Sequence, residues 1–203
     1  MVQNEPRRRG RPRSFDEGQV LEKARGVFWN LGYAATSLDD LAAATGLNRP
    51  SLYAAFGDKH ALYIRALKES RDAGLAGMRQ VFGAELSLRD ALKMLFAGAI
   101  AAYMKGDIGQ RGCFIIGTAV TQSVEDAEAR ALVAGFVSEM DAIFLERFER
   151  AQNELAPGVA PAQAAAMGTA TLHTLAIRAR TGDDHPALKR VAAAAVDIIC
   201  GPA

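Results

Sequence analysis

Hydrophobic residues recur every three or four positions through most of the chain, the spacing expected when helices bury one face. Alternating β-branched runs of the kind that form strands do not occur, and alanine, the strongest helix former, is abundant. The pattern therefore predicts an all-α fold. Its first helix begins near Asp16 and ends at Gly32, and its apolar face consists of Val20, Leu21, Ala24, Phe28 and Leu31.

Two short helices are predicted next. Ser37 is a suitable N-cap for the first, with Asp40 as an acidic partner in its first turn, and Gly46 ends it. Leu38, Leu41 and Ala42 form the apolar stripe of this helix.

Asn48 is a suitable N-cap for the second short helix, which has Pro50 in its first turn and ends at Gly57. Leu52 and Phe56 should face inward from it. Asp58 then caps a long helix that reaches about Gly83.

The second half of the chain predicts five more helical stretches. A long amphipathic one carries Leu132, Phe136, Met140, Phe144 and Phe148 as its stripe. The predicted stretches cover residues 87–105, 112–123, 124–155, 162–180 and 185–200.

Charge distinguishes the N-terminal end, although the net charge of the chain is only +1. Residues 1–13 have no helical periodicity and carry five arginines, so we expect a flexible basic arm that contacts DNA. Arg9-Gly10-Arg11-Pro12 resembles the core of AT-hook peptides, which lie in a narrow A·T minor groove. A tail that binds phosphates without reading bases is the alternative.

The two short helices flank a glycine turn at Gly46, which is the arrangement of a helix-turn-helix. With Leu52 and Phe56 buried, the second helix leaves Arg49, Ser51, Tyr53 and Ala54 toward solvent. These side chains can donate hydrogen bonds to base edges and phosphates and can contact thymine methyl groups. A generic helical hairpin would have the same spacing, so the residue identities must decide between the two.

Those identities resemble the TetR family of regulators over residues 14–65. The resemblance is carried by Gly32-Tyr33, Thr36-Ser37, Gly46-Leu47, Ser51-Leu52-Tyr53, Phe56-Gly57-Asp58-Lys59 and Leu62. His60 departs from the pattern, because the family more often has an acidic residue there, and we expect it to be exposed.

The resemblance implies an N-terminal three-helix DNA-binding domain at residues 14–65 and a larger helical domain for ligand binding and dimerisation at residues 66–203. It also implies phosphate contacts from Thr36, Ser37, Tyr53 and Lys59, although Tyr53 as a half-buried core residue and Lys59 as a solvated lysine are the alternatives. The expected DNA contacts are Arg9, Arg11, Thr36, Ser37, Asn48, Arg49, Pro50, Ser51, Tyr53 and Lys59.

The second domain should enclose an apolar pocket for a small hydrophobic effector. Each of its large residues is also a candidate for ordinary core. Cys113 follows Arg111-Gly112 at a predicted helix start, where the thiol pKa should be lowered, so sensing of electrophiles is an alternative to simple burial. The expected ligand contacts are Met94, Tyr103, Cys113, Phe114, Met140, Phe144 and His173.

Several classes of function lack their motifs. The histidines His60, His173 and His185 show no catalytic spacing, so we expect neither an enzyme nor a cofactor, and no metal motif occurs. The charged N-terminus is no signal peptide and the apolar run at residues 94–104 is too short to span a bilayer, so we expect a cytoplasmic protein.

The sequence thus predicts a homodimeric regulator that binds a near-palindromic duplex and is released by a small molecule. Activation of transcription and non-specific architectural DNA binding are the alternatives.

Overall fold

Helices make up all the regular structure that the computed structural model describes, which is residues 15–105 and 111–202. The all-α prediction is therefore confirmed. The basic arm, with Arg9 and Arg11, lies outside the described residues.

The N-terminal helices follow the predicted capping pattern closely. They are α1 (Glu17–Ala35), α2 (Leu38–Thr45), α3 (Arg49–Phe56) and α4 (Lys59–Gly83). The side chains of Ser37, Asn48 and Asp58 accept hydrogen bonds from the first turns of α2, α3 and α4, as expected. Gly32, with φ of 78° and ψ of 166°, breaks α1 as predicted, but one further turn follows it.

The second half contains α5 (Leu88–Tyr103), α7 (Ala127–Arg150), α8 (Pro161–Arg180) and α9 (His185–Cys200). The short helix predicted at residues 112–123 is instead a π-helical turn, η1 (Ile115–Ala119), followed by the single turn α6 (Val120–Gln122). The helix predicted from residue 124 begins only at Ala127, because Asp126 caps it. It ends at Arg150, and the short 3₁₀ turn η2 (Gln152–Glu154) follows.

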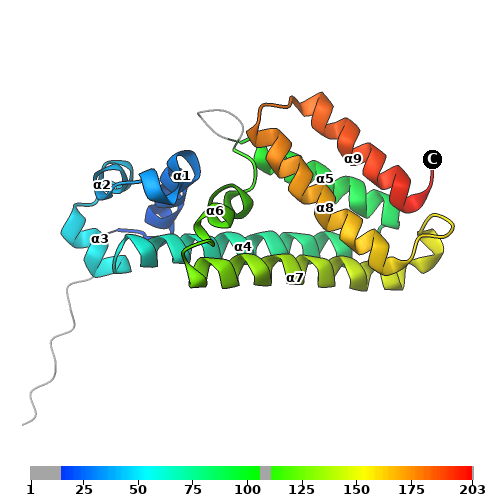
Figure 1. Cartoon of the computed structure of the whole chain (residues 1–203), viewed down its shortest axis with the longest axis horizontal. Helices are drawn as coiled ribbons and strands as arrows, with labels where there is room; N and C mark the ends of the chain where they lie inside the picture. The colour runs from blue at the N-terminus through cyan, green and yellow to red at the C-terminus, as the bar shows by residue number, and fades with distance from the viewer. Residues whose placement is uncertain (1–14, 106–110, 203) are drawn as a thin grey trace, which may run out of the picture.

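Different helices lie at the two ends of the molecule. Figure 1 shows α1, α2 and α3 together at one end, and α5, α8 and α9 at the other. The helices α4 and α7 run side by side along the bottom of this view, beneath both groups, and the short α6 lies near the end of this pair that is closer to α1. The boundary expected at residues 65–66 falls inside α4, which continues unbroken from one end toward the other.

Buried apolar side chains form one continuous core through both ends. Phe28, Leu41 and Leu67 are fully buried at the α1–α3 end, and Phe96, Phe144 and Phe148 are fully buried at the other. None of the described helices is long and apolar enough to cross a membrane.

Candidate nucleic-acid interface and interhelical cavity

The turn between α2 and α3 is fixed by local hydrogen bonds. Gly46 has a left-handed backbone (φ 77°) and its N–H donates to the carbonyl of Ala42. The amide of Asp40 donates to Ser37 Oγ at 3.1 Å, while the Asp40 carboxylate accepts from the Ser37 backbone N–H at 2.8 Å. This capping box fixes the backbone at the start of α2.

The outer face of α3 carries polar and aromatic side chains, as predicted. Leu52 and Phe56 are buried, whereas 47% of Tyr53 is exposed, so Tyr53 is no core residue. Arg49, Pro50 and Ala54 are exposed and Ser51 is half-buried. The helix therefore presents a cation, a phenol and a methyl group to solvent.

Arg49 has a partner that sequence reasoning missed. Its Nε donates to Asp39 Oδ1 at 2.8 Å, and a second nitrogen donates to the other carboxylate oxygen. This hydrogen-bonded pairing raises the pKa of Arg49. Both side chains are exposed, so the pair joins α2 to α3 at the surface and holds the guanidinium in one orientation.

Thr36 and Ser37 are largely engaged within the protein. Thr36 is buried, its hydroxyl donates to the Gly32 carbonyl at 2.6 Å, and its N–H donates to the Tyr33 carbonyl. Ser37 is exposed, but its hydroxyl donates to Asp40 at 2.6 Å. The side chain of Asn48 likewise caps α3 through the Ser51 N–H at 2.9 Å. These residues shape the interface more than they offer free donors to it.

Lys59 lies at the end of α1 rather than free in solvent. Its Nζ donates to the carbonyls of Tyr33 at 3.0 Å and Thr36 at 2.9 Å, and it lies 4.4 Å from the centre of the Tyr33 ring. A cation is favourable at the carbonyl end of a helix. From the sequence we expected Lys59 to bind an external anion, a DNA phosphate. Its two carbonyl partners within the protein were not predicted.

Replacing Lys59 with alanine should lower the free energy of unfolding by about 2–3 kcal/mol, because charge-assisted hydrogen bonds to two carbonyls and a cation–π contact are lost. Thermal unfolding of the purified variant measures this. Lys23→Ala is the matched control, because Lys23 is exposed on α1 and should change stability by less than about 0.5 kcal/mol. A Lys59→Ala protein as stable as its parent would show that these contacts contribute nothing.

A cavity of about 320 Å³ lies between α4 and α5, away from the α1–α3 end. Its floor is made by Phe136 and Met140 of α7 and Leu172 of α8. Three of the predicted ligand contacts, Met94, Tyr103 and Met140, line it.

The other four predicted ligand contacts do not line this cavity. Phe114 packs against Trp29, with ring centres 5.7 Å apart, and Phe144 packs against Phe82 in the core. His173 is half-buried, and its Nε2 has no hydrogen-bond partner among the described residues. The residues that the structure describes contain no cluster of three metal-ligating side chains.

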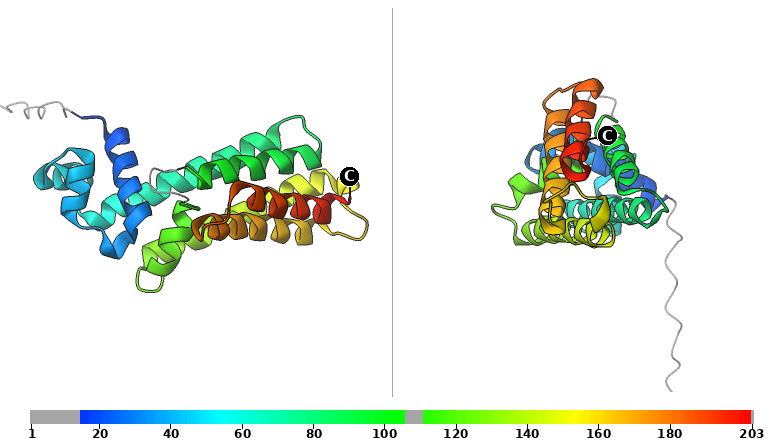
Figure 2. Two further views of the ribbon diagram at one scale, coloured as in Figure 1. Left: turned by 90° about the horizontal axis from the view of Figure 1, so that it is seen from above. Right: turned by 90° about the vertical axis from the view of Figure 1, so that its right-hand side faces the viewer.

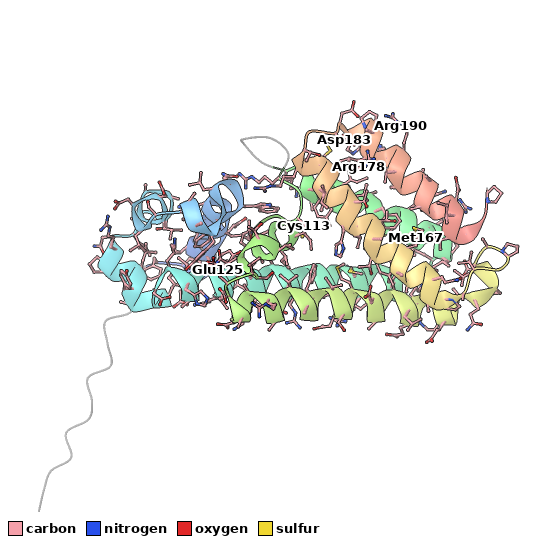
Figure 3. The ribbon with its side chains drawn as sticks, in the orientation of Figure 1. Cys113, Glu125, Met167, Arg178, Asp183 and Arg190 are labelled. Carbon is pink, nitrogen blue, oxygen red and sulfur yellow. The ribbon has the colours of Figure 1, made fainter. Side chains whose placement is uncertain are left out.

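The pKa of the Cys113 thiol differs from the sequence-based expectation. Figure 3 shows it on the segment between α5 and α6. Burial raises the pKa of its thiol, although backbone N–H groups of Ile116 and Ile115 oppose the effect. The expectation of a lowered pKa is therefore wrong, because the segment is packed against its neighbours and loses solvent around the sulfur.

A junction between the two ends surrounds Arg111, and no sequence pattern predicted it. The Arg111 and Gly112 N–H groups both donate to the Tyr103 carbonyl at 3.0 Å. The Arg111 carbonyl in turn accepts from Trp29 Nε1 of α1 and from an Arg180 nitrogen of α8, both at 3.1 Å. One short segment thus connects the cavity residue Tyr103 to α1 and α8.

A second junction involves His60, which was expected to be simply exposed. Its Nε2 lies 2.7 Å from Asp126 Oδ2, so the first turn of α4 is tied to the residue that caps α7. Burial opposes the ionisation of Asp126, but hydrogen bonds from the Ala129 N–H, His60 and the Glu128 N–H lower its pKa overall.

Comparison with known proteins agrees with this architecture. The sequence profile of "Bacterial regulatory proteins, tetR family" matches residues 20–66. The transcriptional repressor ComR of Escherichia coli (strain K12) is 39% identical over 121 residues, which cover 59% of this chain and 57% of ComR. The transcriptional activator FasR of Mycolicibacterium smegmatis (strain ATCC 700084 / mc(2)155) is 35% identical over 82 residues, covering 40% of this chain and 37% of FasR.

Similarity to a solved structure extends over the whole fold. A cysteine mutant of the TetR family regulator CifR, complexed with 26bp double-strand operator DNA, is 30% identical and has a TM-score of 0.82. The match covers 94% of this chain and 100% of that one, so the similarity extends over nearly the whole chain. The chain belongs to the TetR family of bacterial transcriptional regulators.

Proposed function

We propose that the protein is a homodimeric repressor that binds a near-palindromic DNA operator through α3 and is released by a small-molecule effector. The main support is the outer face of α3, where Arg49 and Tyr53 are exposed on a helix whose inner face is buried. A helix presented in this way fits the major groove. The relative ComR is named a repressor and FasR an activator, and the longer match to ComR favours repression.

The residues of the interface divide into two roles. Arg49, at the first position of α3, is placed to read a base edge, provided that its bonds to Asp39 are exchanged for base acceptors. Tyr53 and Ser51 are placed to contact phosphates, together with the backbone N–H groups at the start of α2. Lys59 and Thr36 support these groups from behind, and Asn48 and Pro50 set the start of α3.

The basic arm adds affinity that depends on salt. Arg9 and Arg11 belong to a segment outside the described residues, so their role follows from sequence alone. Insertion into an A·T minor groove and general phosphate binding would each release counterions.

Dimerisation is proposed through α8 and α9. These helices lie side by side on one outer face of the molecule (Figures 1 and 2). Large apolar side chains are exposed on them, namely Met167 (38%), Ile177 (55%) and Ile198 (56%). Pairing this face with its copy would bury these side chains and present two α3 helices to two half-sites.

Effector release is proposed through the Arg111 junction. A ligand in the cavity contacts Tyr103, whose carbonyl holds the Arg111 and Gly112 N–H groups, and the Arg111 carbonyl holds Trp29 of α1. Movement at the end of α5 would therefore reach α1 and shift the DNA-binding end. A coupling of about 1–3 kcal/mol would weaken operator binding roughly 5–150-fold. The protein would act in the cytoplasm, where its operator DNA lies, and would catalyse no reaction.

Replacing Arg49 with alanine should relax base preference at one or two positions of the operator by about 1–3 kcal/mol, because a bidentate base contact is lost. Binding to a panel of single-base operator variants measures this preference. Arg79→Ala is the control, because Arg79 lies on α4 and pairs with Glu139. The assignment is contradicted if Arg49→Ala weakens all variants alike, or if Arg79→Ala changes preference equally.

A further inference from the structure

The cavity between α4 and α5 has an uncharged lining. Its described lining residues are Ala73, Gly74, Gly77, Met78, Val81, Met94, Leu95, Gly98, Ala99, Ala102, Tyr103, Phe136, Met140 and Leu172. Among them, the Tyr103 hydroxyl is the one side-chain group with an oxygen or nitrogen. Burial raises the pKa of this hydroxyl well above its usual value, so it stays protonated and neutral.

Two arginines of α4 near the cavity pair with a carboxylate of α7. Arg71 and Arg79 of α4 both bond to Glu139 of α7, the second at 3.2 Å. They are therefore not directed at a ligand. A charged molecule that contacts this apolar lining would lose part of its hydration and find no charged lining residue to pair with, so a neutral ligand is favoured.

Small residues leave the cavity open between the two helices. Gly77 of α4 and Gly98 of α5 both line it, and a Cβ added to either would meet no atom within 4 Å. Glycine weakens the interior of a helix, so these two positions reduce helix stability while keeping the space free. The open space faces the apolar floor formed by Phe136, Met140 and Leu172.

We propose that the effector is a neutral, largely apolar small molecule that enters between α4 and α5 and makes one hydrogen bond to the Tyr103 hydroxyl. This inference rests on the proposed effector release, which it deepens by giving the chemical class of the ligand. From the sequence we expected a small hydrophobic effector, and the uncharged lining further excludes organic cations and anions.

Two fluorescent probes with the same aromatic skeleton test the class. N-phenylnaphthylamine is neutral, and anilinonaphthalene sulfonate adds one negative charge. We expect the dimeric protein to bind the neutral probe at least about tenfold more tightly, since the sulfonate finds no cation in the cavity. Equal or tighter binding of the sulfonate would overturn the proposed neutrality of the ligand.

Substitutions of glycine test whether the probe binds in the cavity between α4 and α5. Gly98→Leu should fill the cavity and weaken binding of N-phenylnaphthylamine at least about tenfold, while Gly98→Ala should raise the melting temperature by about 1–4 °C. Gly135→Leu is the matched control, because Gly135 lies in α7 outside the lining and its Cβ also meets no atom within 4 Å. Unchanged probe binding in a folded Gly98→Leu protein, or equal loss in Gly135→Leu, would overturn the site.

Tyr103→Phe tests the hydrogen bond, because N-phenylnaphthylamine has an N–H that can donate to the tyrosine oxygen. We expect its affinity to fall about 2–10-fold, the usual contribution of one such bond. An unchanged affinity would overturn the role of Tyr103. If the probe binds as proposed but operator affinity is unaffected, the site and ligand class stand, and the proposed release mechanism fails for this compound.

Discussion

Replacing Ile177 and Ile198 together with glutamate should convert the protein into monomers and weaken its binding to a palindromic duplex about 10²–10⁴-fold, the range lost when two linked sites become independent. Both side chains are more than half exposed on the α8–α9 face, so the free chain tolerates the change. In the proposed dimer the same positions would place charges in an apolar interface without partners, which is strongly unfavourable.

Sedimentation measures the oligomeric state, and titration with full and half operators measures the affinity. Binding to a single half-site should be little changed, because α3 lies at the opposite end of the molecule (Figure 1). Val124→Glu is the control for charge, since Val124 is 75% exposed in the turn before α7. A double variant that remains dimeric would place the dimer interface elsewhere.

Gly112→Ala should lower the free energy of unfolding by about 2–5 kcal/mol, from backbone strain and from crowding. Gly112 has φ of 68°, a region that disfavours residues with a Cβ. An added Cβ would also collide with the Ala176 carbonyl oxygen and lie 3.2 Å from Arg180 Cβ. Since this segment lies between Tyr103 and α8, relief of the collision must open the Arg111 junction.

Thermal unfolding tests this prediction, with an expected fall of about 5–15 °C in the melting temperature. Gly158→Ala separates backbone strain from crowding, because Gly158 has φ of 82° but open space around its Cβ position. It should show the strain alone, about 1–2 kcal/mol. Equal losses from the two variants would mean that the close approach to Ala176 has no energetic consequence.

Local chemistry explains why much of the DNA-binding end could be predicted from sequence. The side chains of Ser37, Asn48 and Asp58 each accept from the amide three residues later, so a short stretch of sequence is enough to predict these caps. The buried pair Leu52 and Phe56 follows from helical spacing in the same way.

Contacts between residues far apart in the sequence could not be predicted from local patterns. Lys59 bonds to carbonyls more than 20 positions earlier, and His60 lies against Asp126. The spacing of Arg49 and Asp39 becomes meaningful only once the α2–α3 turn is known. The cavity was predicted in part, because a large apolar residue on a helix can face either the core, as Phe144 does, or a cavity, as Met140 does.

We propose that two copies of α3, presented by a dimer, read a specific DNA sequence. Selection from random duplexes, followed by titration of the selected and scrambled duplexes at physiological salt, tests it most directly. We predict a near-palindrome with half-sites one helical turn (about 34–36 Å) or a multiple of it apart. The protein should bind this duplex at least about 10³-fold more tightly than its scrambled version. No enriched palindrome, with equal affinity for both duplexes, would contradict the account.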